Sequence, residues 1–310
     1  MPSAELQACL GGTWPPPCAL DAEVTEVEHP QGEAFTRERL SYAAEPGERV
    51  PAFLLIPSAA NVTPCPAIVL CHQHAGQYDI GKSEPAGLAG DPMHHTGVAL
   101  ARQGFIVLCP DALCFEERGQ PRKVEDRYAA EAIVDEAAPE AFNEGGLKTG
   151  EITGGDLERF EFLRYVVNGQ SLAWKSVLDF KRSVDYLVSR PEVAANRIGT
   201  YGHSMGSTHV WLGTPHDPRV IAAVGNCCMP SCECSLRTRT ISHPPEKCLN
   251  GLTDYPCGRC ACTQTHQSTG TASCTATLTS SLAGANPTVT YPTPSPRSAL
   301  AVSTQAIRRC

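Results

Sequence analysis

The chain has 310 residues and a formal net charge of −8. This length allows one or two domains with a large buried core, and the acidic balance argues against non-specific binding to nucleic acid or anionic membranes. No apolar stretch approaches the length of a membrane span, and Met1–Trp14 lacks the basic start and apolar run of a secretion signal. We therefore expect a cytoplasmic protein without nucleic-acid or membrane partners.

Three short runs of alternating apolar and polar residues open the chain, within about residues 20–57. Each is rich in Val, Leu or aromatic residues and is bounded by Gly or Pro, as strands commonly are. They are Asp21–Glu28, Phe35–Ala43 and Arg49–Ile56. We expect them to form an antiparallel edge of a sheet.

Continuous apolar runs then alternate with helical patterns. A run that is apolar throughout is typical of a strand buried on both faces. The predicted buried strands are Pro66–Cys71, Phe105–Cys109, Arg197–Tyr201 and Val220–Gly225, and the predicted helices are His94–Arg102, Leu157–Val167 and Ser171–Arg190. An Ala- and Glu-rich stretch contributes to a helical insertion over about residues 120–170. This alternation predicts a mostly parallel sheet with helices on both faces.

The pentapeptide Gly202-His203-Ser204-Met205-Gly206 lies between a predicted strand and a predicted helix. This G-x-S-x-G pattern is typical of a sharp turn that exposes a serine hydroxyl at the end of a sheet. Small residues flank the serine because larger side chains would collide with the neighbouring strand or helix. We predict that Ser204 is a nucleophile that attacks an acyl carbon.

A nucleophilic serine of this kind needs N–H groups that bind the oxyanion of the tetrahedral intermediate. One donor is expected to be the Met205 N–H at the start of the helix. The other is expected in the loop Cys71–Gly76, after the first buried strand. We place it at the His74 N–H, with the Gln73 N–H as the alternative. A plain strand-to-helix turn that needs small residues would give the same pattern.

These segments and their order resemble the α/β-hydrolase superfamily, and within it the dienelactone-hydrolase-like and acetyl-xylan-esterase-like group. The resemblance covers about residues 20–229. It is carried by PAFLLIP (51–57), HQHAG (72–76), GFIVLCPD (104–111), SRPEV (189–193), RIG (197–199), the serine pentapeptide and DPRV (217–220). It implies hydrolysis of a small-molecule carboxylic ester or lactone through an acyl-enzyme on the serine, without a cofactor or metal. A peptidase of the prolyl-oligopeptidase type shares the serine turn and is the alternative enzyme class.

The resemblance ends before the acid and the histidine that complete the family's catalytic triad. In the family both follow the nucleophile, on late loops. His216 and Asp217 come too early in this order, and His209 lies on the helix after the serine. His243 and His266 lack the family's flanking residues. The acid and the base are therefore unassigned, with His243 and His266 as the histidines to test, and we expect this chain to be catalytically impaired.

Other polar residues near the predicted site allow two interpretations. Asp111 and Glu116–Arg118 follow a strand on the catalytic side of the sheet, so they either line the pocket or form structural ion pairs. His94 and His95 open a helix near the expected oxyanion loop. We expect no metal there, because no carboxylate or thiolate lies at a fitting spacing.

The character of the chain changes near Pro230. Residues 227–310 hold ten of the sixteen cysteines, seven basic and three acidic residues, and neither Phe nor Trp. We interpret residues 1–230 as the hydrolase core and residues 231–310 as an atypical tail, so the sheet is expected to be incomplete at its C-terminal end. Thr263–Pro296, which is rich in Ser, Thr and Pro, is expected to be coil or disordered.

Two hypotheses account for this tail. Cys257-x-x-Cys260-x-Cys262 with His266 has the ligand types of a zinc site, which makes a non-catalytic, zinc-binding protein the alternative outside the enzymes. The spacing is not that of a common zinc finger, and no hydrophobic framework surrounds it. A shifted reading frame explains more, because leucine codons of the form CTG yield cysteine codons when they are read out of frame.

Overall fold

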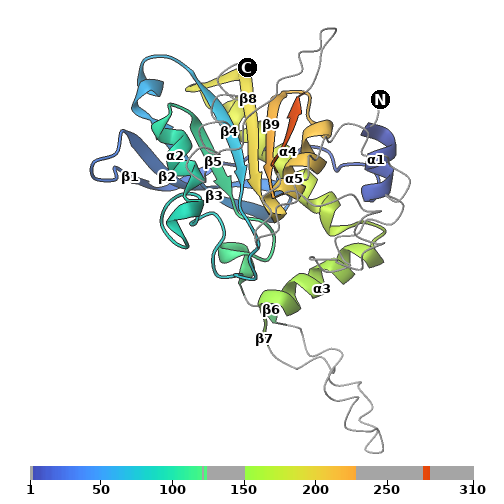
Figure 1. The fold of residues 1–310 in the computed structure, drawn as a ribbon. Helices are drawn as coiled ribbons and strands as arrows, with labels where there is room; N and C mark the ends of the chain where they lie inside the picture. The colour runs from blue at the N-terminus through green and yellow to red at the C-terminus, as the bar shows by residue number, and fades with distance from the viewer. Residues whose placement is uncertain (1–2, 121, 124–150, 228–274, 280–310) are drawn as a thin grey trace, which may run out of the picture.

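The centre of the molecule is an eight-stranded mixed sheet with the strand order β1-β2-β3-β5-β4-β8-β9-β10 (Figure 1). A computed structural model describes residues 3–120, 122–123, 151–227 and 275–279. The four parallel strands of the sheet are β5 (Ile106–Pro110), β4 (Cys65–Cys71), β8 (Val193–His203) and β9 (Val220–Asn226). They coincide with the four predicted buried strands, so the predicted parallel core is confirmed.

The first three strands form an antiparallel edge, as the sequence predicts. Strand β1 (Glu23–Glu28) pairs with β2 (Phe35–Glu45), and β2 pairs with β3 (Glu48–Pro57). Strand β3 then pairs antiparallel with β5, which joins this edge to the parallel strands. The edge thus extends the sheet away from the serine turn.

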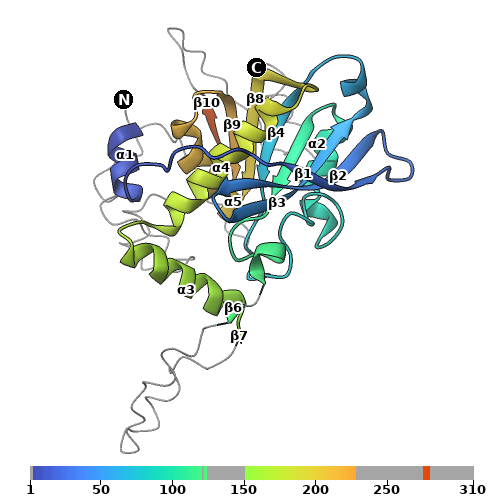
Figure 2. The same ribbon diagram turned by 180° about the vertical axis from the view of Figure 1, so that it is seen from behind.

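Helices cover both faces of the sheet, which confirms the predicted α/β-hydrolase layering. Alternate residues of a strand point to opposite faces, and the side chains of β4 accordingly divide between two cores. Val69 packs in the core under α4 (Leu172–Ser189) and α5 (Met205–Gly213), whereas Ile68 packs in the core under α2 (Thr96–Arg102). Figure 2 shows α4 crossing the first of these faces.

The remaining elements lie at the periphery. They are helix α1 (Ser3–Leu10), helix α3 (Gly154–Val167), the short strands β6 (Arg122–Lys123) and β7 (Glu151–Ile152), and the 3₁₀ turns Ser58–Asn61, Pro92–His94, Glu116–Gly119 and Thr214–His216. Helix α1 is not predicted from the sequence. It is held because Leu10 is fully buried in a third core with Tyr165 and Trp174. Among the described residues no helix combines the length and the apolar character needed to cross a bilayer.

Two of the sequence predictions fall largely outside the described residues. Helix α3 confirms the helix predicted at the end of the insertion, but residues 124–150 are not described. In the tail the structure describes only residues 275–279, which form strand β10 (Thr275–Thr279) antiparallel to β9. This strand differs from the coil expected there, because backbone pairing at a sheet edge requires no apolar pattern. The zinc, frame-shift and incomplete-sheet hypotheses for residues 231–310 stay predictions.

A buried ion network joins α4 to the β2–β3 hairpin and to the loop after β5. The Lys175 ammonium, which is fully buried, lies 2.6 Å from Glu45 Oε1 and 2.9 Å from Asp179 Oδ1. The Arg118 guanidinium bridges Asp179 Oδ2 at 2.7 Å and Glu48 Oε1 at 2.5 Å. Burial by itself would raise the pKa of Asp179, but Arg118 and Lys175 outweigh it and lower that pKa. The network therefore depends on an ionised Asp179.

We predict that Asp179→Asn lowers the free energy of unfolding by about 3 kcal/mol at pH 7, because it leaves two buried cations short of a counter-charge. The pKa of Asp179 is lower in the folded state than its unfolded value of about 3.9. The carboxylate's contribution is then complete above about pH 4 and is lost as the pH falls below it. Urea unfolding at pH 7 and pH 3 should show the deficit of the variant shrinking at pH 3.

The control for this prediction is Asp21→Asn, which alters a surface ion pair. The Asp21 side chain is 82% exposed and pairs with Arg49 at 2.8 Å. An exposed pair of this kind contributes less than about 1 kcal/mol. Equal losses in the two variants would contradict the prediction.

Candidate active site

Ser204 joins the end of β8 to the start of α5. Its backbone has φ 53° and ψ −115°, and non-glycine residues rarely adopt a positive φ. The Ser204 N–H donates to Asn226 O of β9 at 2.9 Å, and the Ser204 carbonyl accepts from the Ser207 N–H at 3.0 Å. The predicted strand, sharp turn and helix are all present, and Ser204 lies at the carboxyl end of a central parallel strand.

Two glycines make this turn sterically possible. A Cβ on Gly202 would lie 2.1 Å from the carbonyl oxygen of Gly206. A Cβ on Gly206 would lie 2.0 Å from Cys71 O and 2.7 Å from His72 O. The missing side chains let the start of α5 lie directly against the carbonyls at the end of β4. This contact also brings the serine turn to the predicted oxyanion loop.

The ring of His72 orients the peptide that carries the predicted donor. His72 Nε2 accepts from the Ala112 N–H at 3.1 Å, so the ring proton is on Nδ1, which donates to Gln73 O at 2.7 Å. Burial lowers the pKa of His72 to about 4, and the ring is neutral at pH 7. Gln73 C=O and His74 N–H belong to one trans peptide and point in opposite directions. By fixing the carbonyl, His72 also fixes the direction of the His74 N–H.

The imidazole of His74 is occupied by contacts within the loop and with α3. Its Nδ1 accepts from the Gly76 N–H at 2.9 Å, and its Nε2 lies 3.1 Å from Glu158 Oε2. The ring also packs edge-on against Phe115, with centroids 4.9 Å apart. The side chain of His74 therefore holds the loop in shape, and the oxyanion role of its backbone N–H stays a prediction.

The histidine beside the nucleophile packs against a second histidine. The centroids of His203 and His94 lie 4.9 Å apart, and His203 Nδ1 lies 3.0 Å from Asn226 Nδ2. Burial, followed by the neighbouring His94, lowers the pKa of His203. Within the part of the chain that the structure describes, no side chain hydrogen-bonds to the Ser204 hydroxyl. No described residue is thus in place as the general base.

The other early histidines and Asp217 make contacts that fit structural roles. His95 Nε2 lies 3.0 Å from Ala89 O. His216 packs edge-on against Trp14, and Asp217 binds the guanidinium of Arg219. His209 lines a small cavity next to His72 and Asp111. The candidates His243 and His266 lie outside the described residues.

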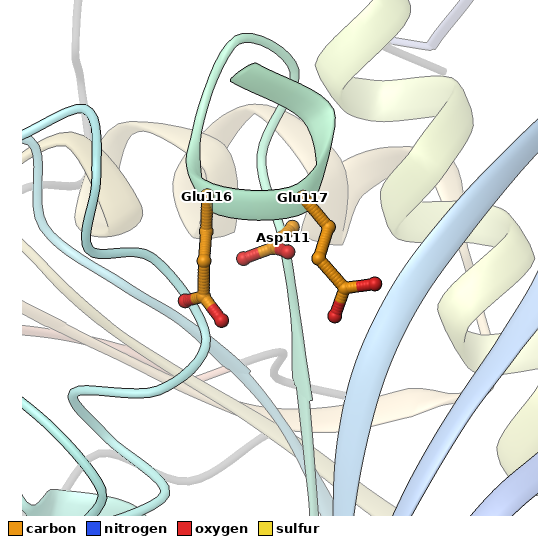
Figure 3. Close-up of side chains that lie close together, drawn as sticks. All are labelled: Asp111, Glu116 and Glu117. Atoms are coloured by element: carbon orange, nitrogen blue, oxygen red, sulfur yellow. The ribbon is translucent and has the colours of Figure 1, made fainter. Parts of the chain in front are cut away.

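The acidic residues after β5 surround a buried lysine. Figure 3 shows the carboxylates of Asp111, Glu116 and Glu117 close together, and these form the one group in the described residues with the ligand types and proximity for a metal ion. The Lys82 ammonium occupies this position, 2.9 Å from Asp111 Oδ2, 2.5 Å from Glu116 Oε1 and 2.8 Å from Glu117 Oε1. Arg118 belongs to the ion network on α4. Of the two interpretations of these charges, the structure supports structural ion pairs.

Burial and the charges of this cluster shift the pKa values of Asp111 and Lys82. Burial, opposed by Lys82 and reinforced by Glu116, raises the pKa of Asp111 to about 7. Burial by itself would lower the pKa of Lys82, but Asp111 and the two glutamates outweigh it and raise that pKa. The cluster thus keeps Lys82 charged at pH 7.

The sequence alone does not single out Lys82, Glu158 or Asn226. Lys82 is 29 residues from Asp111, and Glu158 is 84 residues from His74. Nothing in the residues around either side chain signals the distant partner. The sheet order places the ends of β4 and β9 on either side of β8, with β5 next to β4. Only this tertiary arrangement brings the distant partners together.

Comparison with known proteins agrees with this geometry. The model of the family described as "Dienelactone hydrolase family" matches residues 50–226. "Putative hydrolase YtaP" of Bacillus subtilis (strain 168) is 29% identical over 183 residues, which are 58% of this chain and 48% of that protein. The crystal structure of a "putative acetyl xylan esterase" from Bacteroides fragilis NCTC 9343 aligns with a TM-score of 0.52 and 15% identity, over 71% of this chain and 50% of that one. The chain spans about half the length of each of these two relatives.

We predict that Gly206→Ala destabilises the fold and displaces the serine turn, because the new methyl group has no space beside Cys71 O. Overpacking of this kind costs about 1–3 kcal/mol or more. Gly199→Ala on β8 is the control, since its Cβ would lie 3.4 Å from Ala222 O. Thermal unfolding should show a clear loss of stability for Gly206→Ala and a small one for Gly199→Ala. A Gly206→Ala protein as stable as wild type would contradict the close contact between Gly206 and Cys71 O.

We also predict that Lys82→Met lowers the free energy of unfolding by about 3–5 kcal/mol, because it leaves buried carboxylates without a counter-charge. The loss should grow from pH 5 to pH 8. Lys82 opposes the effect of burial on the pKa of Asp111, so its removal raises that pKa further, and ionising Asp111 as the pH rises costs the variant more than wild type. Urea unfolding at both pH values tests this. Lys181→Met is the control, because the Lys181 ammonium donates to a backbone carbonyl, His216 O at 2.9 Å. A loss that is independent of pH would contradict the assignment.

Proposed function

The chain belongs to the dienelactone hydrolase family, and we propose that it is a serine hydrolase of small carboxylic esters or lactones, which acts through an acyl-enzyme on Ser204. The observation that carries this proposal is the strained turn at Ser204, with its positive φ between β8 and α5. Strain of this kind persists where the surrounding structure imposes it, and it commonly marks functional residues. Here the two glycines and the bond to Asn226 impose it.

In the proposed reaction the Ser204 hydroxyl oxygen bonds to the acyl carbon, and the carbonyl oxygen becomes an oxyanion. The Met205 N–H is one donor, since the first N–H groups of a helix have no partner within it. The His74 N–H is the other, and its fixed peptide plane favours it over the Gln73 N–H. Collapse of the intermediate expels the alcohol, which takes the proton from the serine. Water then hydrolyses the acyl-enzyme.

In this proposal the general base that takes the Ser204 proton belongs to the residues outside the described part of the chain. Without a base the Ser204 hydroxyl stays protonated at neutral pH, and turnover falls by several orders of magnitude. We infer that turnover by this chain is impaired unless His243 or His266 reaches Ser204. Deacylation needs the same base, so an acyl-enzyme formed slowly by such a protein should accumulate.

The test is incubation with p-nitrophenyl acetate followed by mass spectrometry of the protein and its peptides. We expect one acetyl group on the peptide that contains Ser204. Ser204→Ala should not carry it, and Ser58→Ala, which alters an exposed serine, should carry it like wild type. Equal acetylation of wild type and Ser204→Ala would refute the proposal.

Steady-state rates on the same ester test the impairment. We expect turnover far below the ordinary range, which begins at about 1 s⁻¹. Turnover within that range that is abolished by Ser204→Ala would show a complete site. His243→Ala and His266→Ala would then identify the base.

A further inference from the structure

Helix α3 reaches the predicted oxyanion loop through one buried carboxylate. The Glu158 side chain is 5% exposed. Its Oε2 lies 3.1 Å from His74 Nε2 and accepts from the Tyr78 hydroxyl at 2.7 Å. His74 of this loop and Tyr78, just after it, are thus tied to one oxygen atom of a helix that lies far away in the sequence.

The direction of these hydrogen bonds follows from the groups involved. A backbone N–H can only donate, so the Gly76 N–H bound to His74 Nδ1 places the ring proton on Nε2. The Nε2–H then donates to Glu158. Hydrogen bonds to a carboxylate that water does not reach are stronger than those between neutral groups. Glu158 therefore fixes the orientation of the His74 ring, whose tautomer is set by the Gly76 N–H.

The loop needs such external support because its backbone is unfavourable. Ala75 has φ 47° and Gly76 has φ 71°, and alanine rarely adopts a left-handed conformation because its Cβ crowds the backbone. The ring of Phe115 supports the loop from one side, stacked on Tyr78 at 5.0 Å and edge-on to His74 at 4.9 Å. Glu158 supplies the polar contact that these rings cannot.

We propose that Glu158 is a positioning residue, which holds the His74 N–H where it binds the oxyanion. This inference rests on the proposed function. Glu158 does not touch the substrate. Through the side chain of His74 it fixes one end of the Gln73–His74 peptide, and the ring of His72 fixes the other. A donor displaced by about 1 Å can cost about 10²-fold in rate.

The His74 Nε2–H and the Tyr78 hydroxyl both donate to Glu158 Oε2, so replacing this one oxygen tests the proposal. Glu158→Gln keeps one carbonyl oxygen that can accept from His74 and Tyr78, whereas Glu158→Ala removes it. The readout is the rate at which p-nitrophenyl acetate acetylates Ser204, measured against ester concentration. We expect the maximal rate to fall at least tenfold in Glu158→Ala, at an unchanged half-saturating concentration, and to stay within about threefold of wild type in Glu158→Gln.

Glu161→Ala is the matched control for loss of a buried glutamate. Glu161 is on the same helix, is fully buried, and pairs with Arg164 at 2.6 Å. We expect this variant to acetylate at the wild-type rate even if its unfolding temperature falls as far as that of Glu158→Ala. Equal maximal rates in Glu158→Ala and Glu161→Ala would overturn the positioning role.

A second readout does not depend on catalysis. The backbone amide signal of His74 in ¹H–¹⁵N correlation spectra reports where its N–H lies. We expect this signal to keep its wild-type position in Glu158→Gln and in Glu161→Ala, and to shift or broaden in Glu158→Ala. A His74 amide signal that Glu158→Ala leaves unmoved would also overturn the inference. Failure of the proposed function is distinct, because it appears as equal acetylation of wild type and Ser204→Ala.

Discussion

The arrangement of the site depends on the absence of two side chains. Gly202 and Gly206 allow the chain to reverse at Ser204 and allow the first turn of α5 to lie against the carbonyls that end β4. Every other element of the candidate site follows from that approach. It aligns the end of the nucleophile strand with the loop that follows its neighbour, so the Met205 N–H and the His74 N–H both belong to segments next to Ser204. Backbone groups supply the expected oxyanion donors because only backbone comes this close.

Buried charges stabilise the loops around this turn. The Lys82 ammonium ties the loop after β5 to the segment that follows β4, and Lys175 with Arg118 ties the same loop to α4 and the β2–β3 hairpin. Charges removed from water are tolerated only when each has its partner. These two groups of ion pairs account for the buried charges at the end of β5.

The site is unequal in its two halves. The described residues supply the strained turn at Ser204 and a loop that carries the predicted oxyanion donor, and contacts from distant segments hold both in place. The family's acid and histidine would follow β9, where the chain departs from the family pattern. The impairment that we propose thus concerns proton transfer and leaves the binding of the oxyanion intact. Such a chain would form the acyl-enzyme slowly, and water would hydrolyse the acyl group from Ser204 slowly.

The seven strands β1–β5, β8 and β9, the serine turn and the family resemblance were predictable from the sequence, because apolar runs and glycine positions are local consequences of burial and of backbone sterics. Pro66–Cys71 and Arg197–Tyr201 were predictable as buried strands, and Ser204 as the residue between strand and helix. Helix α1 and strand β10 were not, since the first is held by tertiary packing of Leu10 and the second by edge pairing with β9. The contacts of Lys82 and Glu158 could be found only in the folded protein. Their partners are distant in sequence, and a buried ion or hydrogen bond leaves no periodic pattern along the chain.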